Sequence, residues 1–203
     1  MFYMGRTRGY DADEVLGRAM LTFWRQGYER TSVADLVDAT GVARSVLYGE
    51  WGDKRGLLLA AIDGYLREVG RPTLMGLEAG GVAAIRSVFD TVAGQITADD
   101  AVSCLVLETA LAVAPHDEVV AHKVRDALDE VRSRFLQALS SAVQGGTLPP
   151  TTDVQAHADH LAISFQALLI QGRTRPGADA VRRFVDLTLR PLELLETTCS
   201  PSR

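Results

Sequence analysis

The sequence of 203 residues predicts an all-α protein of about nine helices. Apolar residues recur at helical spacing along most of the chain, and neither a run of alternating β-branched residues nor an Asn-Gly hairpin signal interrupts them. Clusters of glycine and proline separate these periodic segments where helices would end. Hydrophobic residues make up 47% of the chain, so it can bury a substantial core.

The first predicted helix begins near Asp11 and ends at Gly27. Asp11 and Glu14 have the spacing of a capping box, in which side chains bond the free backbone N–H groups of a helix start. Six apolar residues then form one inward stripe: Val15, Leu16, Ala19, Met20, Phe23 and Trp24. Residues 1–10 precede this periodicity, and we expect them to form a flexible arm.

Residues 31–51 predict two short helices joined by a glycine. Ser32 and Asp35 form a second capping box, which starts a helix near Val33. Gly41 supplies the permissive backbone that ends this helix and lets the chain turn within a few residues. The pattern is that of a helix-turn-helix.

The second of these helices should expose its N-terminal residues. Val42 and Leu47 return to the core, which leaves Ala43, Arg44 and Ser45 pointing outward. In a helix-turn-helix these positions meet base edges in the major groove of DNA. An arginine there can bond O6 and N7 of guanine, and a serine can donate or accept. The alternative is a surface helical hairpin with one solvated arginine.

Phosphate contacts are predicted near the end of this helix and at the start of the next. The Tyr48 hydroxyl can reach a phosphate. Asp53 is the expected N-cap of the next helix, yet Lys54 and Arg55 follow in its first turn, where the helix dipole disfavours cations. A DNA phosphate at this helix start would make the two cations favourable. The alternative is a pair of solvated charges.

These motifs resemble the DNA-binding domain of the TetR (tetracycline-repressor-like) family of bacterial transcriptional regulators, over residues 11–65. The residues that carry the resemblance are Gly27-Tyr28, Thr31-Ser32, Leu36, Gly41-Val42, Leu47-Tyr48, Trp51, Lys54 and Leu57. Trp51 replaces the usual phenylalanine, and Val46 replaces a threonine or serine that contacts phosphate in many members. The resemblance implies DNA contacts from Thr31, Ser32, Ala43, Arg44, Ser45, Tyr48 and Lys54. The arm with Arg6 and Arg8 either enters a minor groove or has no partner.

The helix that starts at Asp53 should run to about Val69, where Gly70 and Pro72 end it. Further helices are predicted near residues 81–96, 100–114, 117–143, 153–172 and 178–196. The last two carry more apolar surface than one partner helix needs. The resemblance implies that they form a four-helix bundle with a second subunit, and hence a homodimer. The alternative is a bundle filled within one chain.

The middle helices are the predicted place for a small, largely apolar ligand. Residues 103–112 mix small side chains with a thiol and a carboxylate, and resemble a stretch found in one subgroup of the family. We expect the ligand to contact Met75, Phe89, Cys104, Glu108 and Phe135. The alternative for these residues is ordinary core, in which Cys104 is an inert small hydrophobe rather than a redox sensor.

The sequence gives no support for an enzyme, a metal site or a cofactor. It contains no glycine-rich phosphate loop, Gly-x-Ser-x-Gly elbow or His-Glu-x-x-His motif, and His157 and His160 suit a polar helix surface. Only two cysteines are present, and no signal peptide or membrane-length apolar run is visible, so we expect a cytoplasmic protein without membrane contact. The net charge of −5 disfavours nonspecific coating of nucleic acid.

The predicted organisation is a flexible arm (1–10), a three-helix helix-turn-helix domain that binds DNA (11–56) and a helical domain for ligand binding and dimerisation (57–203). The predicted function is that of a transcriptional repressor, which a small apolar inducer releases from double-stranded operator DNA. The alternative is a dimeric helical interaction module without specific DNA binding.

Overall fold

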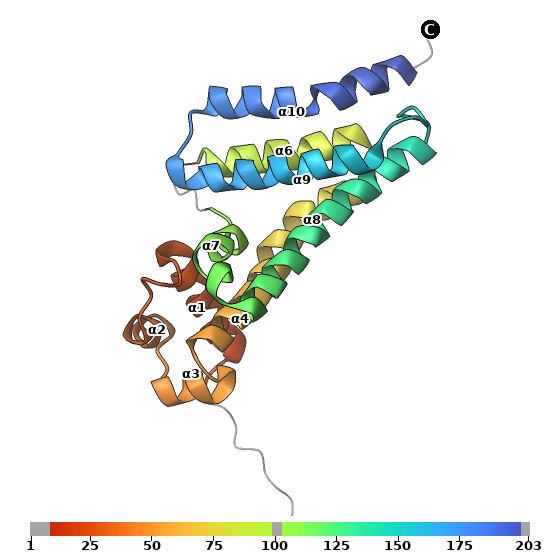
Figure 1. Cartoon of the computed structure of the whole chain (residues 1–203). Helices are drawn as coiled ribbons and strands as arrows, with labels where there is room; N and C mark the ends of the chain where they lie inside the picture. Colours follow the sequence, from red (N-terminus) through yellow and green to blue (C-terminus); the bar gives the residue numbers. More distant parts are fainter. Residues whose placement is uncertain (1–8, 99–102, 200–203) are drawn as a thin grey trace, which may run out of the picture. The chain divides into compact units, whose positions relative to one another are not determined.

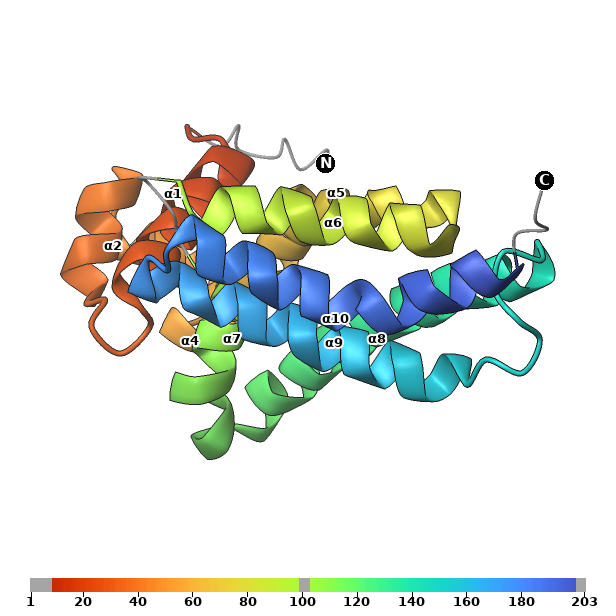
Figure 2. The same ribbon diagram turned by 90° about the horizontal axis from the view of Figure 1, so that it is seen from above.

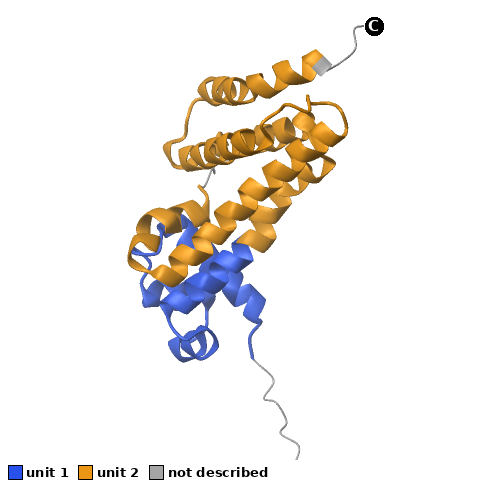
Figure 3. Ribbon diagram, turned by 45° about the vertical axis from the view of Figure 1, so that its right-hand side comes forward, with its two compact units in different colours: residues 1–65 blue, residues 66–203 orange. Residues whose placement is uncertain are grey.

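The computed structural model describes residues 9–98 and 103–199, which divide into two compact units. Unit 1 comprises residues 1–65 and unit 2 residues 66–203 (Figure 3). The predicted arm at residues 1–10 lies almost wholly outside the described residues. Unit 1 ends at Tyr65 rather than at residue 56, because the helix that follows residue 53 packs along the first helix and completes its core.

The described residues of unit 1 form four helices: α1 (Ala12–Gln26), α2 (Val33–Thr40), α3 (Arg44–Trp51) and α4 (Lys54–Tyr65) (Figure 1). The predicted N-caps Asp11 and Ser32 are confirmed, but the capping box is complete only at α2, because the Glu14 carboxylate pairs with Arg18. Asp11 accepts hydrogen bonds from the backbone N–H groups of Asp13 and Glu14, and Ser32 forms a complete capping box with Asp35. The core of the unit is built from side chains with at most 1% of their surface exposed: Ala19, Phe23, Leu36, Leu47, Leu57, Leu58, Ala61 and Ile62.

The helical path after α4 does not end at Gly70 and Pro72 as predicted, but continues through irregular helical turns. A π-helical turn (Leu66–Gly70) leads into the short α5 (Arg71–Leu74) and a 3-10 turn (Met75–Ala79). Pro72 has no N–H to donate to the carbonyl of Glu68, so regular α-helical winding is interrupted one turn before it. Proline is tolerated in the first turn of α5, which explains why the helical path resumes there.

The described part of unit 2 forms five helices of eight or more residues: α6 (Gly81–Ile96), α7 (Leu105–Ala112), α8 (Glu118–Gln144), α9 (Val154–Gln171) and α10 (Ala178–Cys199). Four of them match the predicted ranges within a few residues. The helix predicted from residue 100 begins at Leu105, and residues 99–102 lie outside the described part. Within residues 9–98 and 103–199, nine helices have eight or more residues, so the all-α prediction is confirmed.

The helices of unit 2 pack around an aromatic centre. α8 and α6 each contact α9, and α10 lies along α6, as the two views at right angles show (Figure 2). Phe89 from α6, Phe135 from α8 and Phe165 from α9 form a triangle with ring centroids 5.7 to 5.8 Å apart. At most 3% of any of these side chains is exposed, so the centre is filled by mutual aromatic packing.

An ion-pair cluster also fastens α10 to α6. Arg86 of α6 donates to Asp186 (3.0 Å) and to Glu193 (2.7 Å), which lie on either side of Pro191 within α10. The Glu193 hydrogen bond is the main cause that raises the pKa of Arg86 above its usual value. Among the described residues, no helix is long and apolar enough to cross a membrane.

Candidate nucleic-acid interface

The turn between α2 and α3 fixes which side of α3 faces outward. Gly41 adopts a left-handed conformation (φ 73°), and its N–H donates to the carbonyl of Val37 at 2.9 Å. This conformation is disfavoured for residues with a side chain, which accounts for glycine at the turn. Leu36 of α2 and Leu47 of α3 are both fully buried, so the opposite side of α3 is turned to solvent.

The exposed residues at the start of α3 are those the sequence predicted. Ala43, Arg44 and Ser45 are all exposed, and no side chain caps the helix at Ala43. The Arg44 guanidinium carbon lies 4.9 Å from the ring centroid of the half-buried Tyr48. Such a cation–π contact restrains the guanidinium at the helix surface. Stacking on a ring leaves the N–H donors of the guanidinium, which lie in its own plane, able to form hydrogen bonds.

The two polar residues before α2 have different roles. Thr31 is only 1% exposed, and its hydroxyl donates to the carbonyl of Gly27 at 2.8 Å. The expectation that the Thr31 side chain contacts DNA is therefore corrected: it fastens the loop between α1 and α2 from inside. Ser32 is exposed, and its hydroxyl oxygen accepts from the N–H of Asp35 at 3.1 Å.

Asp35 completes the start of α2 from the other direction. Its carboxylate accepts the backbone N–H of Ser32 at 2.7 Å. This backbone hydrogen bond, followed by that of the Ser32 side chain, lowers the pKa of Asp35. Asp35 therefore stays charged over a wider acidic range than a free aspartate, and its contribution to α2 is lost only as the pH falls through that lowered pKa.

Lys54, at the start of α4, is held by an aromatic ring that the sequence analysis did not assign. Its ammonium nitrogen lies 4.1 Å from the ring centroid of Tyr28. Partial burial lowers the pKa of Lys54, and the nearby Glu29 opposes that shift. The family pattern includes Tyr28, but sequence spacing alone could not show that its ring meets Lys54, because 25 residues and two helices separate them.

Two further residues, Asp53 and Gly56, shape the junction between α3 and α4. The predicted N-cap is confirmed, since the Asp53 carboxylate accepts the N–H of Gly56 at 2.7 Å. Gly56 itself has no room for a side chain, because a Cβ there would lie 1.9 Å from the carbonyl oxygen of Trp51. The glycine therefore permits the tight junction that places Lys54 just after α3.

The five expected ligand contacts lie in different environments among the described residues. Phe89 and Phe135 are fully buried in the aromatic centre, whereas 59% of the Met75 surface is exposed. Cys104 is buried at the start of α7. The Glu108 carboxylate accepts from Arg173 at 2.6 Å and also from the Ser103 hydroxyl, which ties α7 to the turn after α9. A common ligand site for these five side chains therefore stays a prediction, to which their differing exposure lends no support.

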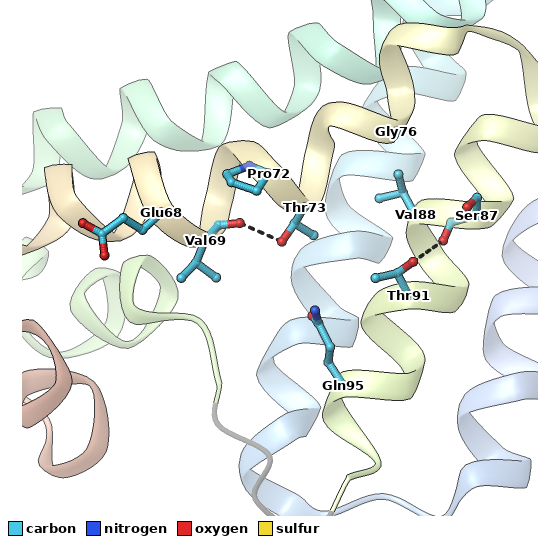
Figure 4. Close-up of a pocket in the computed structure, with 9 residues that line it drawn as sticks. All are labelled: Glu68, Val69, Pro72, Thr73, Gly76, Ser87, Val88, Thr91 and Gln95. Atoms are coloured by element: carbon cyan, nitrogen blue, oxygen red, sulfur yellow. Dashed lines mark hydrogen bonds between the residues drawn. The ribbon is translucent and has the colours of Figure 1, made fainter. Parts of the chain in front are cut away.

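Unit 2 instead has an open groove between the irregular segment after α4 and helix α6 (Figure 4). It has a volume of about 400 Å³, and none of the five expected residues lines it. Its walls combine valine and proline side chains with threonine, serine and glutamine. Within the described ranges, no group of three or more His, Cys, Asp or Glu side chains could hold a metal ion.

Comparison with known proteins decides the family. Residues 15–61 match the family described as "Bacterial regulatory proteins, tetR family", and residues 81–187 match "Tetracyclin repressor-like, C-terminal domain". The chain belongs to the TetR family. It is a DNA-binding transcriptional regulator and not an enzyme, as the sequence predicted.

Relatives align over almost the whole chain. The HTH-type transcriptional regulator YezE of Bacillus subtilis is 31% identical over 94% of this chain and 100% of its own. The HTH-type transcriptional repressor ComR of Escherichia coli is 32% identical over 92% and 90%. Among solved structures, a cysteine mutant of the TetR family regulator CifR in complex with 26-base-pair operator DNA is 28% identical. It has a TM-score of 0.84 and covers 93% of this chain and 100% of its own.

Proposed function

We propose that the protein is a homodimeric repressor that recognises a pseudo-palindromic operator with two copies of α3 and releases it when a small molecule binds in unit 2. The observation that carries the proposal is the exposed start of α3 opposite the buried Leu47. Membership of the TetR family and the operator complex of the related CifR support it. The relative ComR is named a repressor, which favours repression over activation. Because such operators lie on bacterial DNA, the same proposal places the protein in the cytoplasm.

The proposed division of labour follows from where each side chain lies. Arg44 recognises a guanine and Ser45 an adjacent base edge, because both are exposed at the helix start that enters the major groove. Ala43 contacts a base or sugar through its methyl group. Ser32, Tyr48 and Lys54 contact phosphates, which fix the position of the protein without distinguishing sequences.

Homodimerisation is supported by apolar surface that α9 and α10 leave exposed. Ile163 (66% exposed) and Ile170 (40%) lie seven residues apart on α9, and Leu187 (68%) and Leu194 (58%) have the same spacing on α10. Seven residues are two helical turns, so each pair lies on one face. These faces should pack against their copies as a four-helix bundle.

The dimer is tested with two matched substitutions. Leu187→Glu places a charge on the proposed interface, whereas Leu111→Glu does so at an equally exposed leucine (70%) on α7. Light scattering should show a dimer for the wild type and Leu111→Glu, and a folded monomer for Leu187→Glu that binds operator much more weakly. A wild type that is monomeric at micromolar concentration and still protects a single half-site would contradict the proposal.

Release by a small molecule is tested by linkage. If a compound lowers operator affinity by some factor, operator must lower the affinity for that compound by the same factor, with a coupling of about 1 to 3 kcal/mol. Compounds that raise the melting temperature are therefore titrated with and without operator DNA. A compound with equal affinity in both titrations is not an inducer.

A further inference from the structure

The groove in unit 2 has two chemically distinct walls. One wall comes from the π-helical turn and α5 and presents Glu68, Val69 and Thr73. The other is a stripe on α6, where Ser87, Thr91 and Gln95 recur every four residues (Figure 4). The volume of about 400 Å³ lies within the range of small-molecule sites, about 300 to 1,000 Å³.

Two of the three hydroxyl groups that line the groove, those of Thr73 and Thr91, present acceptors rather than donors. Thr73 donates its hydroxyl proton to the carbonyl of Val69 at 2.7 Å, and Thr91 donates to the carbonyl of Ser87 at 2.8 Å. Figure 4 shows both bonds directed along their own helical turns. A hydroxyl that has donated its single proton can only accept further hydrogen bonds. Each threonine therefore offers oxygen lone pairs to an occupant.

The charge of the groove also favours a positively charged occupant. Glu68 is the one charged residue among the described residues that line it. Arg67 pairs with Glu68 at 3.1 Å, but both side chains are more than half exposed, so water screens that pair and a ligand can compete for the carboxylate. Val69, Pro72 and Val88 supply apolar surface beside these acceptors.

We propose that this groove is the effector site and that it selects small organic cations with an apolar body, such as substituted ammonium compounds. The inference rests on the proposed function for the consequence of binding, since it names the ligand class that would release operator. The positive group would lie at Glu68, and the rest of the molecule would lie along Val69 and Val88, beside the threonine oxygens. An anion of the same shape would meet a like charge at Glu68 and would lack a positive side chain among the described lining residues.

The charge preference is tested with a matched pair of probes and calorimetry on the full chain without DNA. Benzyltrimethylammonium should bind, and benzenesulfonate, which has a similar ring and the opposite charge, should not. Glu68→Gln should weaken binding of the cation about two- to fivefold and remove most of its salt dependence. Asp90→Asn makes the same charge change on α6 outside the groove, and should leave binding unchanged.

The location is tested by filling the groove. Thr91 is exposed, so Thr91→Trp should leave the melting temperature close to that of the wild type while its ring occupies the groove and abolishes binding. Equal binding of both probes, or cation binding that survives both Thr91→Trp and Glu68→Gln, would overturn the proposal.

A measurement of operator release distinguishes a failure of this inference from a failure of the proposed function. If benzyltrimethylammonium binds as expected but operator affinity does not change, the groove assignment stands and the proposed release mechanism fails. If another compound releases operator equally well from the wild type and Thr91→Trp, release by a small molecule stands and the groove assignment is wrong.

Discussion

Substitution of Lys54 by alanine should reduce the salt dependence of operator binding without changing sequence preference. Lys54 lies at the start of α4, directly after the N-cap Asp53. Its ammonium nitrogen is 4.1 Å from the centroid of the Tyr28 ring, so the ring orients the ammonium group in the absence of DNA. A contact to phosphate releases condensed counterions and adds about 0.9 to the slope of log affinity against log salt concentration. A dimer has two copies, so Lys54→Ala should lower the slope by about 1.8.

This change in slope corresponds to an easily measured difference. When salt rises fourfold, from about 50 to about 200 mM, the wild type should lose about tenfold more affinity than Lys54→Ala. The assay is fluorescence anisotropy with a labelled operator duplex at several salt concentrations. The chain has one other lysine, Lys123 on α8, and Lys123→Ala is the matched control that should keep the wild-type slope.

The lowered pKa of Lys54 gives the same prediction a pH dependence. Phosphate stabilises the charged ammonium, so operator binding favours protonation of Lys54. Affinity should therefore fall as the pH rises toward the pKa of Lys54, which burial places below the ordinary value of 10.5. Lys54→Arg should bind without this fall, because arginine stays protonated. A Lys54→Ala variant with the wild-type salt slope, or with altered base preference, would refute the assigned phosphate contact.

Three other substitutions test separate parts of the structure. Arg44→Ala should cost about 1 to 3 kcal/mol and relax preference at one base position, and an unchanged preference in a panel of mutated operators would count against guanine recognition. Ser32→Asp should keep thermal stability, since aspartate is an equally good N-cap, but weaken operator binding by repelling phosphate; undiminished binding would exclude a phosphate contact there. Phe135→Ala should lower the free energy of unfolding by about 3 to 5 kcal/mol in denaturant titrations, and a loss below about 1 kcal/mol would show that the aromatic centre is loosely packed.

The positions of the helices could be predicted because several local signals indicate the same helix boundaries. At α1 and α2 the capping residue, the apolar spacing and the terminal glycine all indicate one helix, and Asp11, Ser32 and Gly41 have the predicted roles. The exposed start of α3 also follows from spacing, since Leu47 is buried and Arg44 is exposed. Such agreement between local signals specifies secondary structure well.

Contacts between distant residues were less predictable. Thr31 is buried although its family pattern suggested a contact, because its hydroxyl can bond the Gly27 carbonyl one turn earlier. Phe89 and Phe135 could equally have lined a cavity or filled a core, and only Phe165 from a third helix decides for the core. Sequence periodicity gives the buried face of each helix but not which faces meet.

The path after α4 was predicted wrongly for a related reason. Glycine and proline commonly end helices, but Pro72 occupies the first turn of α5, where a missing N–H is tolerated, so it interrupts the regular winding without ending the helical path. The irregular turns that result form one wall of the groove. No sequence signal for a π-helical turn was available to place that wall.

The central claim, that two copies of α3 recognise a symmetric operator, is tested most directly by selecting bound duplexes from a random DNA pool with the purified full-length protein. The account predicts enrichment of one sequence with two inverted half-sites whose centres lie about 10 base pairs, or a multiple of that, apart. It also predicts that Arg44→Ala loses the preference at one symmetric pair of positions. Recovery of unrelated sequences, or of a single half-site without its inverted copy, would contradict the account.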